Sequence, residues 1–417
     1  MNEIIFGVLV LLFFIVIFLM KEVREEESDD IRYIIKHKLL TREIAIENLR
    51  SIDPLSLIKG TEEFNSKELG ENEVIISNDI KVEKEEIKED LITFLVENDN
   101  PEDVDLLLEY ESEEEIFKRS LKSGSLEIIK SLTDTFNIGD DIESLKTFLK
   151  DNYGLNPIAS VMRWCCINGK LNVVEWLVDK YKINESIIRE DKCMCFSEAV
   201  ASGNLELVKF LKNKYNLNKG DAEANNGMAI YNSIFFNHFE MLKWLITEFN
   251  LLRKNVIDED GENFITACGC DNIDIIKFLA ENFKISKEEA IKRNYTSLMN
   301  FISKHKGKQN FIWYAEMFSL NEKDIKFLIT KIFCFASIDV IIYISTKYKI
   351  KGSDISYDSL QTIIENDRDD VLSFIHNKIS SIENFVKKND CYLYKHARIN
   401  NSSRCIEFFI KEIGVLK

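Results

Sequence analysis

Apolar residues recur along the chain in a 22-residue unit whose spacing predicts a pair of helices. The clearest copies of this unit start at Phe117, Met162, Phe196, Ile230 and Phe264. Further copies with a weaker pattern start at Met299, Ile329, Leu360 and Tyr394. The first position is apolar in every copy, and most neighbouring starts lie 34 or 35 residues apart. This regularity favours one repeat array over several unrelated domains.

Two other positions of the unit keep the same kind of side chain through seven successive copies. Position 20 is aromatic, as Phe136, Tyr181, Tyr215, Phe249, Phe283, Phe318 and Tyr348. Position 22 is aliphatic, as Ile138, Ile183, Leu217, Leu251, Ile285, Leu320 and Ile350. The last two copies depart from the pattern, because they have Ile379 and Ile413 at position 20.

The third copy illustrates how each unit divides into two helices. Residues 196–202 are expected to form the first helix and 205–215 the second, with Gly203 in a left-handed conformation between them. Other copies have residues that tolerate positive φ at this turn, namely Gly124, Gly169, Asn237 and Asp271. One helix pair cannot bury the apolar face of its second helix, whereas stacked pairs can. The predicted fold class is therefore all-α, a helix-pair solenoid.

These residues resemble the ankyrin repeat. The stretch 199–211, A-V-A-S-G-N-L-E-L-V-K-F-L, is similar to the ankyrin run of a small-residue helix, a glycine turn and an apolar helix. Residues 255–264 are similar to the turn that precedes the first helix. A small residue stands where ankyrin repeats place a packed alanine, as Ser120, Cys165, Ala199, Ser233 and Ala267. The resemblance covers residues 117–415, most clearly to 285, and is closest to the divergent ankyrin proteins of amoebae and giant viruses.

One feature of the ankyrin repeat is missing from every copy. The Thr-Pro-Leu-His tetrapeptide does not occur, and the third copy has Met194, Cys195, Phe196 and Ser197 in its place. The hydrogen bonds that this tetrapeptide makes must be absent or replaced. Irregular hairpin tips are therefore expected between successive helix pairs.

The first 20 residues predict a membrane anchor. Residues 4–20 contain no charged or polar side chain, and as a helix they would span about 26 Å, close to the thickness of a bilayer core. Neither a basic start nor a small-residue cleavage site marks a signal peptide. Lys21 and Arg24 follow the run, so the positive-inside rule places the N-terminus outside and the repeat domain in the cytosol. Sequons at Asn184, Asn294, Asn400 and Asn401 should then stay unmodified.

Charge is distributed unevenly along the chain. Residues 21–120 hold 30 acidic and 14 basic side chains, whereas residues 121–417 hold 40 of each. We therefore expect a transmembrane anchor at 1–21, an acidic spacer that is partly helical or disordered at 22–90, and the repeat array at 91–417. Alternatively, part of the spacer packs as an N-terminal cap on the array. The balanced charge of the array argues against a nucleic-acid partner.

Candidate catalytic and metal-binding residues have ordinary structural explanations. The nine cysteines are scattered, no C-x-x-C pairs have matching spacing, and several occupy small or apolar helix positions. The acidic run at 258–262 lacks the carboxylate that a calcium loop requires at its end. Motifs for a nucleophile elbow, a phosphate loop or a kinase are missing. We therefore expect no enzyme activity and no catalytic, cofactor or metal site.

The ankyrin resemblance implies a protein that binds an unidentified protein partner through hairpin tips and first helices. The tip residues expected to contact this partner are Arg189, Glu190, Asp191, Lys219, Asp221, Glu223, Arg253, Lys254 and Asp258. One alternative is a self-assembling structural protein that organises a membrane or virion surface, which a monomer in sedimentation would exclude. Another is an enzyme with an unrecognised site in residues 296–417.

Overall fold

The computed structural model describes residues 42, 45, 46, 49, 88–149, 156–257, 261–383, 386 and 391–415, without the side chains of 292–294. This part of the chain is helical and contains no β-strand, which confirms the all-α prediction. It forms two compact units, one ending at Glu190 and the other beginning at Asp191. The predicted anchor at 4–20 lies outside the described residues. Within them, no helix combines the length and the apolar character needed to cross a bilayer.

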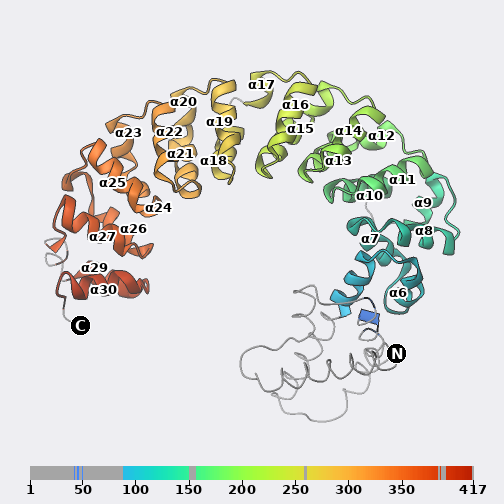
Figure 1. Ribbon diagram of the computed structural model, residues 1–417, viewed down its shortest axis with the longest axis horizontal. Coiled ribbons are helices and arrows are strands. Elements are labelled where there is room, and N and C mark those ends of the chain that lie inside the picture. The colour runs from blue at the N-terminus through green and yellow to red at the C-terminus, as the bar shows by residue number, and fades with distance from the viewer. Residues whose placement is uncertain are drawn as a thin grey trace, which may run out of the picture. The chain divides into compact units, whose positions relative to one another are not determined.

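The first unit contains three helix pairs and one inserted helix among its described residues (Figure 1). Residues 88–97 are helical and are followed by η2 (Pro101–Asp103), α6 (Val104–Tyr110), α7 (Glu113–Ser123), α8 (Leu126–Thr135), α9 (Ile142–Leu149), α10 (Pro157–Ile167), α11 (Leu171–Tyr181) and α12 (Glu185–Ile188). The inserted helix α9 accounts for the 45-residue spacing between the first two predicted copies. Its Phe148 ring lies 5.2 Å from that of Phe117, so α9 packs on the core of the preceding pair.

A short part of the predicted spacer packs on this unit. Arg42 is bound to the buried Asp103 carboxylate, with 2.6 Å between Nη2 and Oδ1. Ala45 and Leu49 are fully buried, and the Leu49 carbonyl accepts a hydrogen bond from the Tyr110 hydroxyl at 2.8 Å. Arg42 and Leu49 therefore contact η2 and α6 of this unit.

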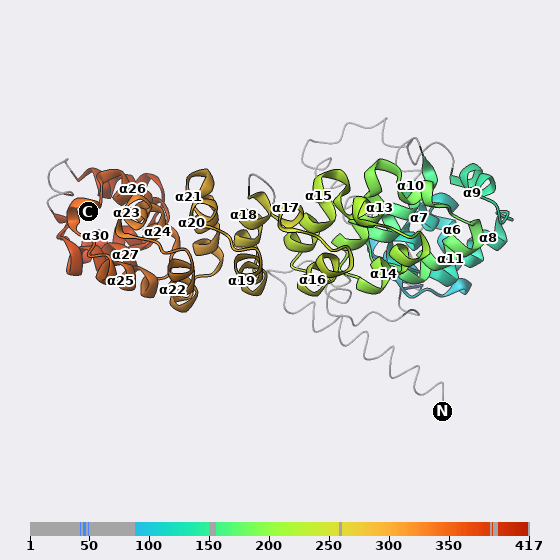
Figure 2. The same ribbon diagram turned by 90° about the horizontal axis from the view of Figure 1, so that it is seen from above.

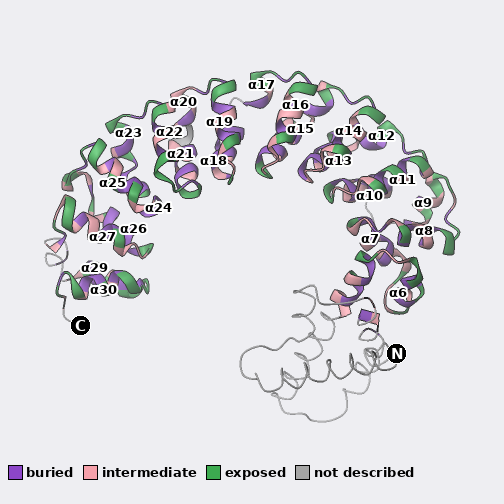
Figure 3. Cartoon of the chain, in the orientation of Figure 1, coloured by how far each residue is buried: buried purple, intermediate pink, exposed green. Residues whose placement is uncertain are grey.

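The second unit stacks seven helix pairs among its described residues. The pairs are α13 (Glu190–Ala201, within this unit from Asp191) with α14 (Leu205–Lys214), α15 (Lys219–Phe235) with α16 (Phe239–Glu248), α18 (Glu262–Gly269) with α19 (Ile273–Asn282), α21 (Lys292–Lys304) with α22 (Lys308–Met317), α24 (Ile329–Phe335) with α25 (Ile338–Lys347), α26 (Tyr357–Glu365) with α27 (Asp369–Phe374), which η5 (Ile375–Ile379) extends, and α29 (Tyr392–Ile399) with α30 (Ser403–Lys411). First helices from α13 to α26 lie in one layer and second helices from α14 to α27 in the other (Figure 2). Each pair has a buried side, as Figure 3 shows.

The aromatic and aliphatic columns found in the sequence mark the ends of the second helices. The residue between them has a left-handed backbone in all seven copies, with φ between 47° and 50°. In six of these copies the aliphatic residue then donates its N–H to the carbonyl five residues earlier, as Leu251 does to Ile246 at 2.9 Å. This hydrogen bond and the left-handed residue together form a Schellman motif, which satisfies carbonyls at the helix end. The columns therefore fix where each second helix stops, in addition to filling the core.

A third column, at position 15, is aromatic in eight copies. Its members are Trp176, Phe210, Trp244, Phe278, Trp313, Tyr343, Phe374 and Phe408. In four copies the ring packs edge to face on the aromatic ring at position 20, with centroid separations from 5.8 to 6.4 Å. Edge-to-face packing of this kind is a favourable arrangement for two aromatic rings. In these four copies it covers the end of the second helix with a half-buried ring.

The turns inside the helix pairs follow the prediction in part. Gly203 has φ +77°, and a Cβ at this position would meet the His238 ring at 2.5 Å. The His238 Nε2 in turn lies 2.9 Å from the Ala201 carbonyl oxygen, so this histidine is structural. The prediction of positive φ at Asp271 is wrong, because that turn closes through an extended Cys270. In the sixth copy the fully buried first position is Leu298 rather than Met299.

Successive pairs are joined by short helices and left-handed turns instead of β-hairpins. We call the short helices α12, α17 (Arg253–Val256), α20 (Lys287–Ala290) and α23 (Glu322–Phe327), the first turn of α15 and η4 (Gly352–Asp354) the tip segments. After two of them, three consecutive residues have left-handed φ, at 191–193 and at 225–227. Gly261 and Tyr295 repeat this conformation at the same 34-residue interval. The tips are thus regular, which differs from the irregular hairpins expected.

Candidate functional site

The tip segments share one capping arrangement in five successive repeats. The third residue of each short helix accepts a hydrogen bond from the backbone N–H of the residue that caps the helix, at 2.8 or 2.9 Å. The accepting residues are Asp221, Asn255, Glu289, Asp324 and Asp354. This is one half of a capping box, and it satisfies an N–H that the helix itself leaves free. These acceptors therefore hold each tip in shape.

Basic residues at the tips connect each repeat to the next one. Lys219 Nζ lies 3.4 Å from the Asn250 carbonyl oxygen, and Arg253 Nε lies 2.8 Å from that of Phe283. Arg253, Lys287 and Lys326 also reach the accepting carboxylate of the following tip, in the pairs Arg253–Glu289 at 2.5 Å, Lys287–Asp324 at 2.6 Å and Lys326–Asp354 at 3.1 Å. We call this series of contacts the tip ladder. It stabilises the boundary between repeats.

The ladder changes the pKa values of its carboxyl groups. Burial acts to raise the pKa of Asp324, but the ammonium of Lys287 and the N–H of Asn321 stabilise the carboxylate more strongly. The pKa of Asp324 therefore lies below its ordinary value, and the same holds for Glu289 beside Arg253. The charged form of these groups is part of the folded structure.

The predicted contact residues occupy three kinds of place. Asp221 is buried, where it accepts from the Asn218 N–H and lies 3.3 Å from the Cys193 sulfur, so it is not on the surface as a contact residue must be. Intramolecular ion pairs or hydrogen bonds engage Arg189, Glu190, Lys219, Glu223 and Arg253. Asp191 and Lys254 are exposed, and Asp258 lies outside the described residues. Most of these side chains thus stabilise the tips.

An exposed aromatic cluster lies on the first helix α15. The Tyr231 and Phe235 rings stack at 5.7 Å, and Phe236 packs edge to face on Phe235 at 5.0 Å. Phe235, the last residue of α15, is 49 % exposed, and Phe236, which caps that helix, is 45 % exposed, although both are large apolar residues. The equivalent residues of the preceding copy, Ala201 and Ser202, are small. The sequence analysis missed this cluster, and its signal was two aromatic residues at unit positions that are small in the neighbouring copy.

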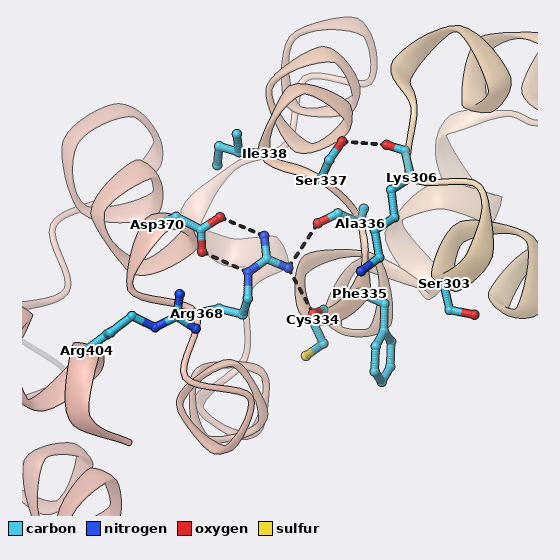
Figure 4. Close-up of a pocket in the computed structure, with 10 residues that line it drawn as sticks. All are labelled: Ser303, Lys306, Cys334, Phe335, Ala336, Ser337, Ile338, Arg368, Asp370 and Arg404. Atoms are coloured by element: carbon cyan, nitrogen blue, oxygen red, sulfur yellow. Dashed lines mark hydrogen bonds and ion pairs between the residues drawn. The ribbon is translucent and has the colours of Figure 1, made fainter. Parts of the chain in front are cut away.

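A hollow of about 360 Å³ lies along the turns of the last four repeats (Figure 4). Its lining residues are Ser303, Lys306, Cys334, Phe335, Ala336, Ser337, Ile338, Arg368, Asp370 and Arg404. Arg368 is held between the Asp370 carboxylate, with two contacts of 2.8 Å, and the carbonyl oxygens of Cys334 and Ala336. Its guanidinium therefore caps the C-terminal end of α24, which favours positive charge.

Stacked helix pairs that are each joined to the next define a helix-pair repeat protein. Within this class, residues 196–289 match the family model described as Ankyrin repeats (3 copies). The match identifies this stretch as ankyrin repeats and confirms the resemblance for the copies that start at Phe196, Ile230 and Phe264. No curated protein matches the chain. Ankyrin repeats imply interaction with other proteins.

Proposed function

We propose that this protein is a membrane-tethered array that binds a protein partner and is not catalytic. The observation that carries the proposal is the exposed aromatic cluster of Tyr231, Phe235 and Phe236 within the ankyrin-matched residues. Exposed aromatic side chains grouped on one face are costly to leave in water and are enriched among residues that dominate binding energy. A partner that covers these rings would remove their apolar surface from water and so lower the free energy of the complex.

The cluster is supported by contacts within its own repeat and from the next repeat. Phe235 lies in the last turn of α15, and its carbonyl oxygen lies 3.6 Å from the Cys270 sulfur of the next repeat. Each ring also packs on a neighbouring ring. A surface that is already ordered loses little conformational entropy on binding, which favours affinity. The adjacent repeat thus helps to position the cluster through Cys270.

The tether rests on the sequence of residues 4–20, which are uniformly apolar. An anchor followed by Lys21 and Arg24 would hold the array on the cytosolic side of a membrane. A tethered binder meets membrane-associated partners at a raised effective concentration. The tether therefore supports recruitment of a partner to the membrane.

Proximity labelling in the source cell tests both parts of this proposal. We expect a set of partner proteins to be labelled by the intact chain and to be lost, by at least about tenfold, when Phe235 and Phe236 are both changed to serine. Deleting residues 1–21 should keep the binding but disperse the labelled set away from the membrane. The matched control is Asn213→Ser, which alters an exposed residue of the second helix α14, outside the tips and first helices. An unchanged labelled set in the double variant would refute the aromatic site, provided that its circular dichroism and Tm match those of the unaltered chain.

A further inference from the structure

A buried histidine bonds the turn that supports the exposed aromatic cluster. His305 caps the end of α21, is 8 % exposed, and its ring lies 5.0 Å from that of Phe301. The ring Nε2 lies 2.9 Å from the carbonyl oxygen of Cys270, in the turn between α18 and α19. The neutral ring therefore donates an Nε2–H hydrogen bond to this carbonyl. His305 thus holds the turn of the preceding repeat.

Cys270 extends this contact to the repeat before. Its backbone is extended, with φ −89° and ψ 163°, and it closes the turn after α18. Its sulfur lies 3.2 Å from the carbonyl oxygen of Thr266 and 3.6 Å from that of Phe235. Phe235 is the central ring of the aromatic cluster, because it packs on both of the other rings. The contacts of His305 therefore reach the cluster through one residue.

The surroundings of the His305 ring disfavour a positive charge. Burial lowers the pKa of His305 below its ordinary value, and the ammonium of Lys304 acts in the same direction. The carbonyl of Cys270 and the carboxylate of Asp271 act in the opposite direction but do not compensate for burial. Asp271 and Lys304 are exposed and lie 3.5 Å apart, so each also screens the other. The buried ring is therefore neutral in the folded protein near pH 7.

Titratable groups in the adjoining helices stay neutral. Burial raises the pKa of the Cys268 thiol in α18 and of the Tyr314 hydroxyl in α22. The Tyr314 ring lies 4.6 Å from the Phe301 ring, which in turn contacts His305. A proton on His305 would therefore place a positive charge beside neutral, largely apolar groups, which is unfavourable.

We propose that acidification opens the turn at 269–272 and, through Cys270, loosens the end of α15 that carries the aromatic cluster. The cluster is then ordered near neutral pH and loosened at about pH 5. This inference rests on the proposed function, because it describes the regulation of the same binding site. A partner binds less tightly in acid, since it must order the cluster again.

The response depends on where the proton on His305 is more stable. A protonated ring is stabilised by water and destabilised by burial, so opening of the turn takes up a proton from solvent. Opening therefore becomes more favourable as the pH falls below about 6.5, the ordinary pKa of histidine. The effect is complete once the pH lies below the lower pKa of the folded ring. When the ring leaves, the Cys270 carbonyl loses its donor and the turn can separate from α15.

Hydrogen exchange of the purified full chain, followed by mass spectrometry, tests the proposal without any partner. The reporters are peptides that cover 233–239 and 268–273, which contain the bonded N–H groups of Asn237 and Cys270. Dividing each exchange rate by the intrinsic rate at the same pH gives the opening equilibrium. We expect opening of both peptides to increase at least about threefold from about pH 7.5 to about pH 5, since one pKa unit between open and folded states corresponds to about tenfold.

Three variants separate the proton from the hydrogen bond. His305→Gln should abolish the increase, because an amide donates a similar hydrogen bond but takes up no proton in this range. His305→Lys carries a charge throughout, so its opening should already be raised at about pH 7.5. The matched control is His396→Gln, which removes the histidine bound to Glu365 in the last helix pair and should keep the increase.

Several outcomes would overturn the proposal. Equal opening of 268–273 in the unaltered chain at both pH values would do so whatever the variants show. An undiminished increase in His305→Gln would assign the response to another group, and opening of 268–273 with 233–239 still protected would remove the link to the cluster. Loss of the aromatic site in the labelling experiment, with this opening still observed, would instead reject the proposed function alone.

Discussion

Single residues that follow the tip segments hold backbone conformations that their side chains disfavour. Asp191, Lys192 and Cys193 have φ of 49°, 59° and 62°, although left-handed conformation costs about 1 to 2 kcal/mol for an ordinary residue. The equivalent turn of the next repeat is built from two asparagines and Gly227, which tolerate it better. The sequence alone predicts a left-handed turn at Gly227, because glycine adopts positive φ readily, but it does not predict one at Lys192. Asn226, the equivalent residue of the next repeat, has the same left-handed conformation, so the shared repeat geometry accounts for Lys192.

Replacing Lys192 by glycine is expected to stabilise the protein by about 0.5 to 1 kcal/mol. Glycine removes the strain at positive φ, and part of the gain is offset by its greater freedom in the unfolded chain. Urea denaturation followed by circular dichroism measures the change. The control Glu281→Gly lies inside the regular helix α19 and should destabilise by a similar amount. A stability loss in Lys192→Gly would show that its side chain contributes more than its backbone costs.

The aromatic and aliphatic columns mark where the second helices of this protein end. The sequence predicted the aromatic and aliphatic columns correctly as repeat positions, since both are set by side-chain type. It did not reveal that the residue between them is left-handed in every copy. Asparagine, which tolerates this conformation, stands there in three copies, but Lys182, Lys284 and Ser319 do not favour it. The tip ladder was also missed. Its basic and acidic residues look like solvated surface charges until the neighbouring repeat is placed beside them.

Changing Asp324 to asparagine tests the ladder through its pH dependence. The pKa of Asp324 is lower in the folded protein than the value near 3.9 of an unfolded chain, so its stabilising contribution is complete above about pH 4. That contribution is lost as the pH falls through the folded pKa. We therefore expect Asp324→Asn to be destabilised by about 1 to 3 kcal/mol at pH 7, with a smaller difference from the unaltered chain at pH 3. Urea denaturation at both pH values measures it.

The control for this experiment is Asp339→Asn, which changes an exposed carboxylate of α25 that takes no part in the ladder. It should leave the stability nearly unchanged at both pH values. A destabilisation by Asp324→Asn that stays constant from pH 7 to pH 3 would mean that the lost contact is steric rather than ionic.

The whole molecule combines parts that the sequence reveals to different degrees. The helix-pair array follows from periodicity, because each pair must bury an apolar face against its neighbour. The inserted helix α9 was visible only as a longer spacing. Leu49 is buried in the first unit, and the sequence alone does not show which helices cover it. Likewise, the exposure of Phe235 depends on what the adjacent repeats leave uncovered.

Topology gives a prediction for the chain as a whole. Asn184, Asn400 and Asn401 are exposed and belong to Asn-x-Ser sequons, so an oligosaccharyltransferase could reach them in the lumen. If the array is cytosolic, endoglycosidase treatment should leave the electrophoretic mobility of the protein unchanged. A control chain whose first 21 residues are replaced by a cleaved secretory signal should shift on the same treatment. A shift in the unaltered chain would reverse the proposed orientation.

The tip ladder restricts the lengths of insertion and deletion that the array can accept. Lys219 contacts the carbonyl of Asn250, a left-handed residue after an aromatic one, and Lys284 occupies the equivalent position 34 residues later. If one 34-residue unit between them were lost, the carbonyl of Lys284 would take the place of the Asn250 carbonyl beside Lys219. Recombination can therefore lengthen or shorten the array by whole units while every boundary keeps its bonds. Insertions of any other length would put the two sides of a boundary out of register.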